Sequence, residues 1–512
     1  MPIKSLSIEN FKGIGSRQVV PLTAITLLFG PNSAGKSTIL HALNYLNDLI
    51  NRFDPNGGRG QHGSSAMDLG GFVHFVHQHD ISRSISISVD LDLDGVDLFE
   101  TRANRAYRQL YEAASPSQRR TGGMVDMTAI TARVLAASFD IEVAWSKEVD
   151  GPYVRRLDIS LNGSDFVSIE CSEDARSSKI SRLLLDHSIL REEDEDGWKA
   201  VARNAIADRF YSDAGVAVIS LAGGKHAIPN WRDGLEVGDV WREVNEDERG
   251  SQMTLVALLN CLICGSLETL GQELAGLRYI GPLRDIPGRS RRMDGNGSTW
   301  GAGLAAWDLV GSDSIVRSDV NNWLDPKHLG LGYELLSQPV VEIAESFERV
   351  VEVAAEPLDR YRRLLLRDTS RQVDVYPHDI GIGVSQLIPV VVGALAREAR
   401  ILAVEQPELH IHPRLQVALG DLFIHAAKGQ GKRFLLETHS EHLMLRLLRR
   451  LRETHEGAVR TEYSLSPDDL QVLYVECVEG ETRISSLRVS EAGNFVDRWP
   501  HGFFGERFEE DF

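Results

Sequence analysis

The sequence predicts an α/β protein in which polar loops follow buried strands at one edge of a sheet. Three observations lead to this fold class. An apolar run at Ala24–Phe29 is followed by a glycine-rich loop and then by a helical pattern up to about Leu49. A second apolar run, Ile401–Val404, ends at the acid Glu405, and a third, Arg433–Glu437, is followed by polar residues. Short apolar runs without polar alternation are typical of strands that are covered on both faces.

The composition is that of a globular protein. The chain has 512 residues and is 42% hydrophobic and 25% charged, which is enough for several domains. No apolar run reaches the ~20 residues that a membrane-spanning helix needs. The longest, Met253–Leu267, contains Asn260 and is expected to be a buried helix. The N-terminus lacks the layout of a signal peptide, and four cysteines fit a reducing compartment, so a cytoplasmic location is expected.

The charge and cysteine patterns limit which ligands the protein is expected to bind. A formal net charge of −19 argues against nucleic-acid binding over most of the surface, although a local basic groove stays open. Two arginine clusters, 284–292 and 446–452, are more typical of solvated loops and helix faces than of a DNA site. Cys261 and Cys264 form a CxxC without a second pair, and their helical spacing predicts core packing rather than a zinc site.

Other elements follow in chain order. Residues 3–11 largely alternate apolar and polar side chains, and residues 84–93 do so strictly, so both are predicted to be strands. Residues 51–65 are rich in glycine and asparagine and are predicted to be a loop. From about Val96 to Leu267, mixed strands alternate with polar helical stretches, and no heptad run is long enough for a coiled-coil arm.

The glycine-rich loop matches a phosphate-binding motif. Gly30–Ser37 reads GPNSAGKS and fits G-x-x-x-x-G-K-[ST]. Its glycines let consecutive N–H groups point at phosphate oxygens, and the helix N-terminus adds partial positive charge. Lys36 is expected to reach the β- and γ-phosphates, Ser37 to hold Mg²⁺, and Thr38 to lie near the α-phosphate. The residues expected to bind ATP here are Asn32, Ser33, Ala34, Gly35, Lys36, Ser37 and Thr38.

The acid at the end of the second strand completes the predicted magnesium site. Glu405 is expected to hold Mg²⁺ directly or through water. Gln406 stands where a glutamate usually polarises the attacking water, and an amide can orient water but cannot accept its proton. Two alternatives stay open: hydrolysis is slow, or Glu408 supplies the base. His410 and His412 are expected to serve packing and interface rather than a metal.

Two further segments are expected at the same edge. His439 follows the strand Arg433–Glu437 and is expected to sense the γ-phosphate, because ligands collect at the carboxyl ends of parallel strands. Asp379–Leu387 (DIGIGVSQL) is a second glycine-rich helix start that suits an anionic group. A second phosphate cradle in one chain makes sense if it caps the nucleotide of another subunit.

Taken together, these segments resemble the ABC-type ATPases of the RecF, SMC and OLD group, and a bacterial OLD-like branch with a short C-terminal domain of unknown function. GPNSAGKST is similar to the Walker A motif, DIGIGVSQ to the signature, ILAVEQPELHIHP to the Walker B region and ETHSEHL to the switch-histidine region. The resemblance covers about residues 1–80 and 270–512. It implies a P-loop NTPase with the mixed sheet of an ABC-type ATPase head, a large α+β insertion and a small C-terminal module. The expected domains are an N-terminal lobe (1–80), the insertion (81–270), a C-terminal lobe (271–455) and the module (456–512).

The resemblance also implies a mechanism. Two subunits would sandwich two ATP molecules with Mg²⁺, so that Gly383 and Ser385 act in trans on the nucleotide of the partner. Lys12 would approach the nucleotide from the region after the first strand. Gln78 in the lid loop (residues 68–80) would sense Mg²⁺ and the γ-phosphate, with His74 or His77 as alternatives.

Two departures shape the expected function. Gln406 favours a switch that dwells in its ATP state, and the ~55 residues after the ATPase core are too few for the Toprim nuclease domain of OLD nucleases. We therefore expect a slow ATPase without intrinsic nuclease activity, dimeric or of higher order, that controls a separate effector in bacterial antiphage defence. The ATPase component of PARIS-type systems is similar. The alternatives are a RecF-like ATPase that binds DNA through Arg446, Arg449 and Arg450, and a non-hydrolysing ATP-assembled scaffold.

Overall fold

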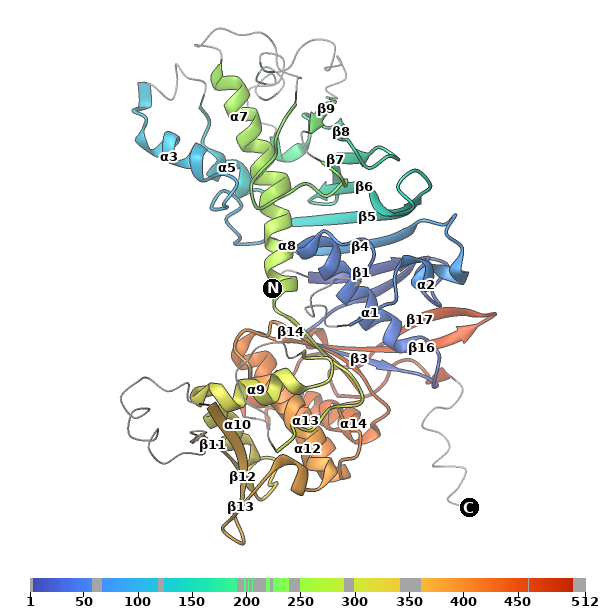
Figure 1. The fold of residues 1–512 in the computed structure, drawn as a ribbon, viewed down its shortest axis with the longest axis vertical. Coiled ribbons are helices and arrows are strands. Elements are labelled where there is room, and N and C mark those ends of the chain that lie inside the picture. Colours follow the sequence, from blue (N-terminus) through green and yellow to red (C-terminus); the bar gives the residue numbers. More distant parts are fainter. Residues whose placement is uncertain are drawn as a thin grey trace, which may run out of the picture.

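A computed structural model describes most of the chain. The described residues are 3–57, 67–117, 124–190, 198, 201, 205, 218–221, 224–238, 249–289, 299–340, 361–458 and 460–500. Arg291, Arg292 and the acidic tail at 501–512 lie outside them. Figure 1 shows the N-terminus near the middle of the molecule, between a part that holds β4–β9 and a part that holds α9–α14.

The central sheet is built from strands that are far apart in the sequence. Its strands are, in spatial order, β10 (Leu277–Ile280), β14 (Ile401–Glu405), β15 (Arg433–Glu437), β3 (Ile25–Phe29), β16 (Leu470–Val478) and β17 (Glu481–Leu487). The first five strands are parallel to one another, and β17 is antiparallel to β16. The central sheet is therefore mixed, as the sequence predicts.

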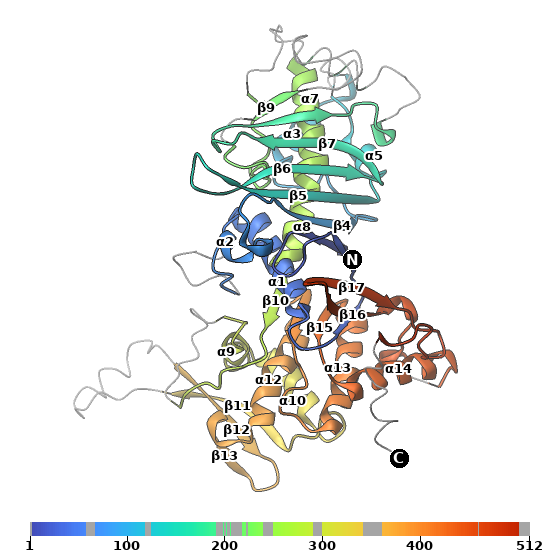
Figure 2. The same cartoon turned by 90° about the vertical axis from the view of Figure 1, so that its right-hand side faces the viewer.

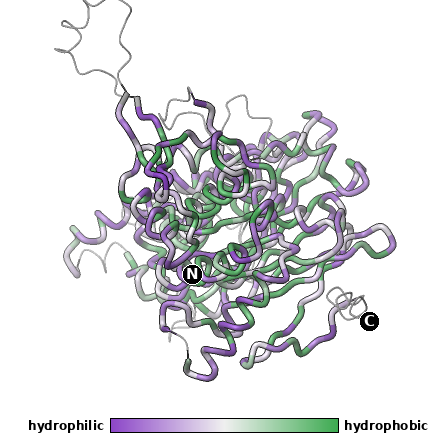
Figure 3. Tube along the Cα trace, turned by 90° about the horizontal axis from the view of Figure 1, so that it is seen from below, coloured by the Kyte–Doolittle hydropathy of each residue, from purple (hydrophilic) through white to green (hydrophobic). Residues whose placement is uncertain are grey.

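Both faces of the central sheet are covered, which explains the unbroken apolar runs of β3, β14 and β15. Ile25, Leu27 and Phe29 pack into the same core as α12, α13 and α14, whereas Leu28 packs with α1 into the other core. The covering helices are α1 (Lys36–Asn47), α12 (Ile382–Leu395), α13 (Pro413–Gln430) and α14 (Glu441–His455). Figure 3 shows the more hydrophobic trace gathered towards the interior.

A large antiparallel sheet forms the other half of the molecule. Its strands are, in spatial order, β2 (Gln18–Pro21), β1 (Ile3–Glu9), β4 (Ile85–Asp92), β5 (Ala136–Ser146), β6 (Gly151–Leu161), β7 (Ser164–Cys171), β8 (Ser178–Leu183) and β9 (Ile219–Leu221). Buried and more exposed residues alternate along β5, as expected of a sheet with one covered face. The helical run α7 (Arg249–Leu259), η6 (Asn260–Gly265) and α8 (Ser266–Ala275) covers that face (Figure 2).

A small sheet and short helices complete the described residues. The small sheet consists of β11 (Tyr333–Val340), β12 (Tyr361–Asp368) and β13 (Val373–Val375), and it contacts α9 (Leu304–Ser312) and α10 (Ser314–Leu324). The remaining elements are η1 (Asp48–Arg52), α2 (Phe72–Phe75), η2 (His77–His79), α3 (Arg105–Ala113), α5 (Met127–Thr131), η3 (Ser188–Leu190), η7 (Pro377–Asp379), η8 (Thr461–Tyr463) and η9 (Pro467–Asp469).

Sheet pairing runs across two of the predicted domain boundaries. β1 pairs with β4, so the large antiparallel sheet crosses residue 80. β16 pairs with β3, so strands of the predicted C-terminal module lie in the central sheet. Main-chain hydrogen bonds therefore join the last segment of the chain to the first, and the first segment to the predicted insertion.

One helical run among the described residues has the length and hydropathy of a membrane span. This run, Gly250–Ala275, is mostly buried inside the protein. Cys261 and Cys264 lie on it and are fully buried. The run is thus a core helix in this structure, as expected from the sequence of residues 253–267.

Gly30 gives a direct test of the contact between β3 and β16. Its φ is 144°, and a Cβ atom at this position would lie 1.9 Å from the main-chain oxygen of Val475. We predict that Gly30→Ala lowers the thermal midpoint much more than Gly95→Ala. Gly95 also has a positive φ, of 73°, but a Cβ atom placed on it would have no neighbour within 4 Å. Backbone strain alone costs about 1–3 kcal/mol, so equal losses in the two variants would contradict the predicted clash.

Candidate nucleotide-binding site

The phosphate loop (residues 30–37) leaves β3 and leads into α1, as the motif predicts. Ser33 has a φ of 62°, which helps the backbone to curl. Lys36 is 3% exposed, and its Nζ donates to the main-chain oxygens of Gly30 (3.0 Å) and Pro31 (2.8 Å). Burial lowers the pKa of Lys36, while nearby glutamates raise it. The ammonium group therefore lies inside the loop, where phosphate oxygens can replace the carbonyl acceptors.

The phosphate loop is braced by β17. Thr482 Oγ1 donates to the main-chain oxygen of Ala34 (3.0 Å), and its N–H donates to the oxygen of Gly13 (2.8 Å). Gly35 has a φ of 99°, and a Cβ atom on it would lie 2.3 Å from Thr482 Oγ1. The close approach of β17 thus needs a glycine at position 35, and it fixes the loop against the segment that follows β1.

Two glutamates lie in register at the ends of neighbouring strands. Glu405 ends β14, Glu437 ends β15, and the two residues are paired across the ladder. Ser37 Oγ donates to Glu437 Oε2 (2.7 Å), and Lys36 Nζ lies 4.0 Å from Glu437 Oε1. Burial raises the pKa of Glu437, and the nearby charge of Glu405 raises it further. Two buried carboxylates beside the phosphate loop favour a cation at this edge.

Glu405 is held in its ionised form by three residues of other elements. Tyr279 of β10 donates to Glu405 Oε1 (2.7 Å), and His41 Nε2 lies 3.5 Å from the same oxygen. Burial opposes ionisation of Glu405, but these hydrogen bonds outweigh it and lower its pKa. Lys12 contacts the other ring nitrogen of His41. Burial lowers the pKa of Lys12 to about 8, against the charge of Glu405, so this predicted nucleotide ligand lies in the same network.

The acid loop (residues 405–412) is tied to the segment that follows β15. Gln406 is half-buried and has a φ of 45°. Glu408 accepts hydrogen bonds from Thr438 Oγ1 (2.8 Å) and from the N–H of His439 (2.7 Å). Burial raises the pKa of Glu408. His439 is half-buried, and burial together with Lys36 lowers its pKa, so a neutral imidazole is expected beside the loops.

The signature segment (residues 379–387) starts α12 next to the acid loop. A Cβ atom on Gly383 would lie 2.5 Å from the main-chain oxygen of His410. Ser385 is fully buried, and its hydroxyl donates to the main-chain oxygens of Pro377 (3.3 Å) and Gly381 (3.4 Å). The hydroxyl thus has partners in its own chain, and its predicted action in trans requires that α12 move. The roles of Gly383 and Ser385 in trans stay predictions.

In the lid loop, Gln78 lies on the surface, whereas the alternative residue His77 is buried. Gln78 is exposed, and its Oε1 accepts a hydrogen bond from Arg83 (3.4 Å), so the structure does not bring it to Ser37 or Glu405. Its neighbour His77 is buried, and its Nδ1 lies 2.8 Å from the main-chain oxygen of Lys12. The metal-sensing role of Gln78 stays a prediction.

The two histidines of the acid loop have structural positions. His412 Nδ1 accepts from the N–H of Arg414 (3.2 Å) and caps α13, and His410 is exposed with a φ of 63°. Within the described part of the chain, no group of three or more His, Cys, Asp or Glu side chains is arranged to hold a metal. His412 therefore serves as a helix cap, and the expectation that the pair does not bind a metal stays a prediction.

The donors at the sheet edge fit a nucleotide-bound Mg²⁺. A hydroxyl and carboxylates are the hard oxygen ligands that Mg²⁺ prefers, and such sites use one or two carboxylates together with substrate phosphates. Ser37, Glu405 and Glu437 would hold the ion. When bound, it would neutralise charge on the β- and γ-phosphates.

Sequence reasoning missed several residues of this network. Glu437 ends an apolar strand in the same way as Glu405, so the sequence pattern is enough to identify it. His41 and Tyr279 have no motif of their own, because their roles depend on how α1 and β10 pack beside β14. Thr482 belongs to the hairpin of β16 and β17, which joins the central sheet through the long-range pairing of β16 with β3.

Family models match three separate parts of the chain. Residues 1–120 match a model described as an AAA ATPase domain, and residues 276–445 match one described as "AAA domain, putative AbiEii toxin, Type IV TA system". Residues 465–510 match "Protein of unknown function (DUF3696)". No curated protein matches the chain.

The chain is also similar to solved structures of SMC head domains, at low identity. One is the SMC head bound to the C-winged helix domain of ScpA (11% identity, 96% of this chain and 98% of that chain, TM-score 0.40). A second is the SMC head domain from Thermotoga maritima (11%, 96% and 100%, TM-score 0.37). A third is the Smc head domain with an extended coiled coil bound to the C-terminal domain of ScpA derived from Pyrococcus furiosus (10%, 95% and 97%, TM-score 0.37).

The fold and the site together define a P-loop ATPase of mixed α/β architecture. The two ATPase models cover the phosphate loop, the signature segment and the acid loop. The central sheet places the phosphate loop and the acid loop at the carboxyl ends of parallel strands, and the signature segment contacts the acid loop, which fits the head of an ABC-type ATPase. The expected fold class is therefore confirmed.

Glu437 provides a test of the magnesium site. We predict that Glu437→Gln weakens ATP binding in Mg²⁺ at least about tenfold, or ~1.4 kcal/mol, because an amide carries no charge for the cation. In EDTA, the affinities of variant and parent should nearly coincide. Titration with a fluorescent ATP analogue measures both, with Glu491→Gln, a 75% exposed carboxylate, as control. Unchanged Mg²⁺ dependence in Glu437→Gln would exclude Glu437 from the metal site.

Proposed function

We propose that the chain is an ATP-operated switch that hydrolyses ATP slowly and dimerises in the ATP state. One observation carries this proposal. Lys36, Ser37, Glu405 and Glu437 meet at the edge of the central sheet, but an amide, Gln406, directly follows the acid. The groups that bind a triphosphate and its metal are assembled, whereas the usual general base is replaced.

The surroundings of Glu408 support slow hydrolysis. Both of its carboxylate oxygens accept hydrogen bonds, from Thr438 and from the main chain of His439. A hydrogen bond to a charged group contributes about 1.5–3 kcal/mol, so releasing Glu408 to act on water carries a substantial cost. Glu408 is better suited to report the position of His439 than to replace the missing base.

The face around the signature segment supports dimerisation. Ile382, at the start of α12, and Leu283, in the loop after β10, are 57% and 76% exposed. The N–H of Arg284, the residue after Leu283, donates to Gln386, one helical turn after Ile382. Exposed apolar side chains beside a helix N-terminus suit a surface that a second copy covers. Gly383 and Ser385 would then act on the nucleotide of that copy.

We further propose that the switch controls a separate effector in bacterial antiphage defence. The family description that matches residues 276–445 names a toxin and a toxin–antitoxin system, which supports a defence context. The ATPase itself would carry no nuclease activity. ATP and Mg²⁺ are the ligands of this proposal, and a cytoplasmic location goes with it.

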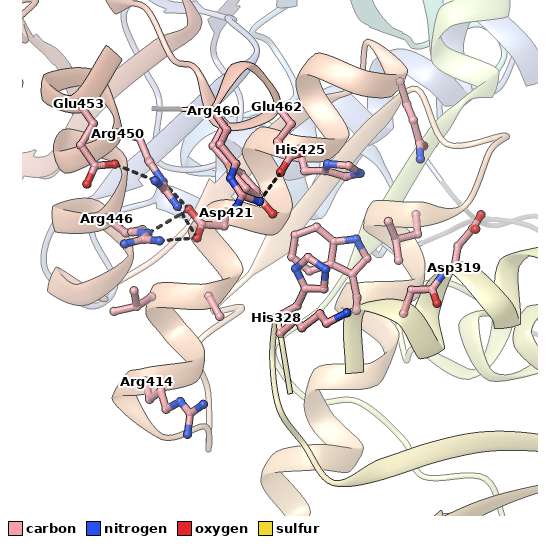
Figure 4. Close-up of a pocket in the computed structure, with 18 of the residues that line it drawn as sticks. Asp319, His328, Arg414, Asp421, His425, Arg446, Arg450, Glu453, Arg460 and Glu462 are labelled. Carbon is pink, nitrogen blue, oxygen red and sulfur yellow. Dashed lines mark hydrogen bonds and ion pairs between the residues drawn. The ribbon is translucent and has the colours of Figure 1, made fainter. Parts of the chain in front are cut away.

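The DNA-binding alternative has less support. Its arginines lie on α14 beside a cavity of about 1170 Å³, with a wall that includes α13. Arg446 and Arg450 both donate to Asp421, at 2.5–3.0 Å, and Arg450 also pairs with Glu453 (Figure 4). Arg449 pairs with Glu453 as well. Two carboxylates pair with these three arginines, so the cluster offers little net charge to a phosphate backbone.

Gln406 tests the slow-hydrolysis proposal. We predict that Gln406→Glu raises steady-state phosphate release by at least about tenfold, because a positioned general base contributes 10²–10⁴-fold. The Lys36→Ala variant sets the background. A parent protein at that background would favour the ATP-assembled scaffold, and a Gln406→Glu variant no faster than the parent would remove the basis of the proposal.

Self-association tests the dimer. Sedimentation velocity should show association in ATP and Mg²⁺ that is much weaker without nucleotide and in Lys36→Ala. Leu283→Glu should abolish it, because a charge would be placed in the proposed interface. Val19→Glu, at a 56% exposed position on β2, is the matched control and should associate like the parent. Association of Leu283→Glu at parent strength would contradict this interface.

A further inference from the structure

Arg284 lies in an arginine-rich segment but is almost fully buried. The sequence predicts that the cluster 284–292 is solvated, and for Arg284 this is wrong, because its exposed fraction is 4%. Its guanidinium lies against the end of β14. Nη2 donates to the main-chain oxygens of Glu405 (2.7 Å) and Gln406 (3.1 Å). Arg284 therefore holds the backbone at the point where the strand becomes the acid loop.

The same residue is bonded to the signature helix. The N–H of Arg284 donates to Gln386 Oε1 (3.1 Å), and Gln386 Nε2 donates back to the main-chain oxygen of Arg284 (2.6 Å). In addition, Arg284 Nη1 donates to the main-chain oxygen of Gln386 (3.3 Å). Gln386 is buried and directly follows Ser385. One residue thus joins the acid loop to the signature segment, which belong to different elements.

The contacts of Arg284 with the acid loop and the signature segment, called the joint below, leave one donor of Arg284 without an acceptor. Within the described part of the chain, the buried Nε of Arg284 has no hydrogen-bond partner. Burial lowers the pKa of Arg284 to about 10, while Glu408 and Glu405 raise it, so the guanidinium is charged at neutral pH. A buried charged donor without an acceptor is unfavourable, and the cost falls if another arrangement of the acid loop supplies one.

We propose that Arg284 is a positioning residue that transmits the nucleotide state of the acid loop to the signature segment. The proposal rests on the ATP-driven dimer proposed above. In this structure, the bonds of Arg284 hold α12 where the hydroxyl of Ser385 is buried. A shift of the Glu405 and Gln406 carbonyls on nucleotide binding is carried through Arg284 to Gln386. The first turn of α12 then presents Ser385 to a second copy.

The experiment compares two equilibria in the same variants. ATP affinity is measured with a fluorescent ATP analogue at protein concentrations where each chain is single, and self-association is measured by sedimentation velocity with and without ATP. For Arg284→Met, we expect ATP affinity within about threefold of the parent and a ratio of association constants, with against without ATP, that falls at least about tenfold. Gln386→Ala removes the bonds on the signature side, and it should likewise keep the ATP affinity and lower the ratio of association constants. Arg284→Lys keeps the charge but has no planar fork to span both segments, so it should restore the ratio only in part.

Hydrogen exchange supplies a readout that a purely structural role would not move. In single parent chains, ATP should change the exchange of main-chain amides in the first turn of α12 and at the end of β14. In Arg284→Met, the response at β14 should stay and the response at α12 should disappear. Arg371→Met, on an 81% exposed arginine of the small sheet, is the matched control and should behave like the parent.

The outcomes separate this inference from the proposed function. If the parent associates with ATP and Arg284→Met keeps the parent's association ratio and α12 response, Arg284 does not transmit the nucleotide state. If Arg284→Met loses ATP affinity and association in proportion, its role is to maintain the fold, and the inference is overturned. If the parent shows no ATP-driven association, the proposed dimer fails, and the coupling fails with it.

Discussion

The site depends on the carboxylates of two glutamates that end adjacent strands at a buried edge of the sheet. Glu405 and Glu437 are in register, and each would repel the other's charge in these buried surroundings. The protein stabilises them in different ways. Glu405 has hydrogen bonds from Tyr279 and His41, whereas Glu437 has the hydroxyl of Ser37 and the nearby ammonium of Lys36. One carboxylate is therefore held ionised by fixed protein donors, and the other is partnered by groups of the phosphate loop itself.

This division links the state of the phosphate loop to the rest of the sheet edge. Ser37 and Lys36 contact Glu437 in this structure, and both are groups that a triphosphate and its metal recruit. A triphosphate that recruits both groups would leave the carboxylate of Glu437 without these two partners, and the segment after β15 includes His439, whose N–H is bonded to Glu408. The acid loop and the segment after β15 are thus connected to the phosphate loop through short hydrogen bonds.

The sequence predicts those parts of the site that local pattern determines. A buried strand before a glycine loop, and an acid at the end of an apolar run, give the phosphate loop and Glu405 without any knowledge of pairing. The structure brings them together as expected. Contacts that depend on packing between distant elements could not be read in this way. Arg284 stands in a run of arginines that is typical of solvent, and only the docking of α12 beside β14 buries it. Ser385 has its hydroxyl turned into its own helix start, a detail of the backbone that spacing does not reveal.

Thr482 lies near the end of the chain, so its contacts with the phosphate loop form late in synthesis. β3 and the phosphate loop emerge from the ribosome early, but the strands on either side of β3 are β15 and β16, and the brace on the loop comes from β17. A growing chain that has not yet reached residue 482 leaves this loop without its brace. The contacts of β17 with the phosphate loop therefore form only after residues 481–487 have been made.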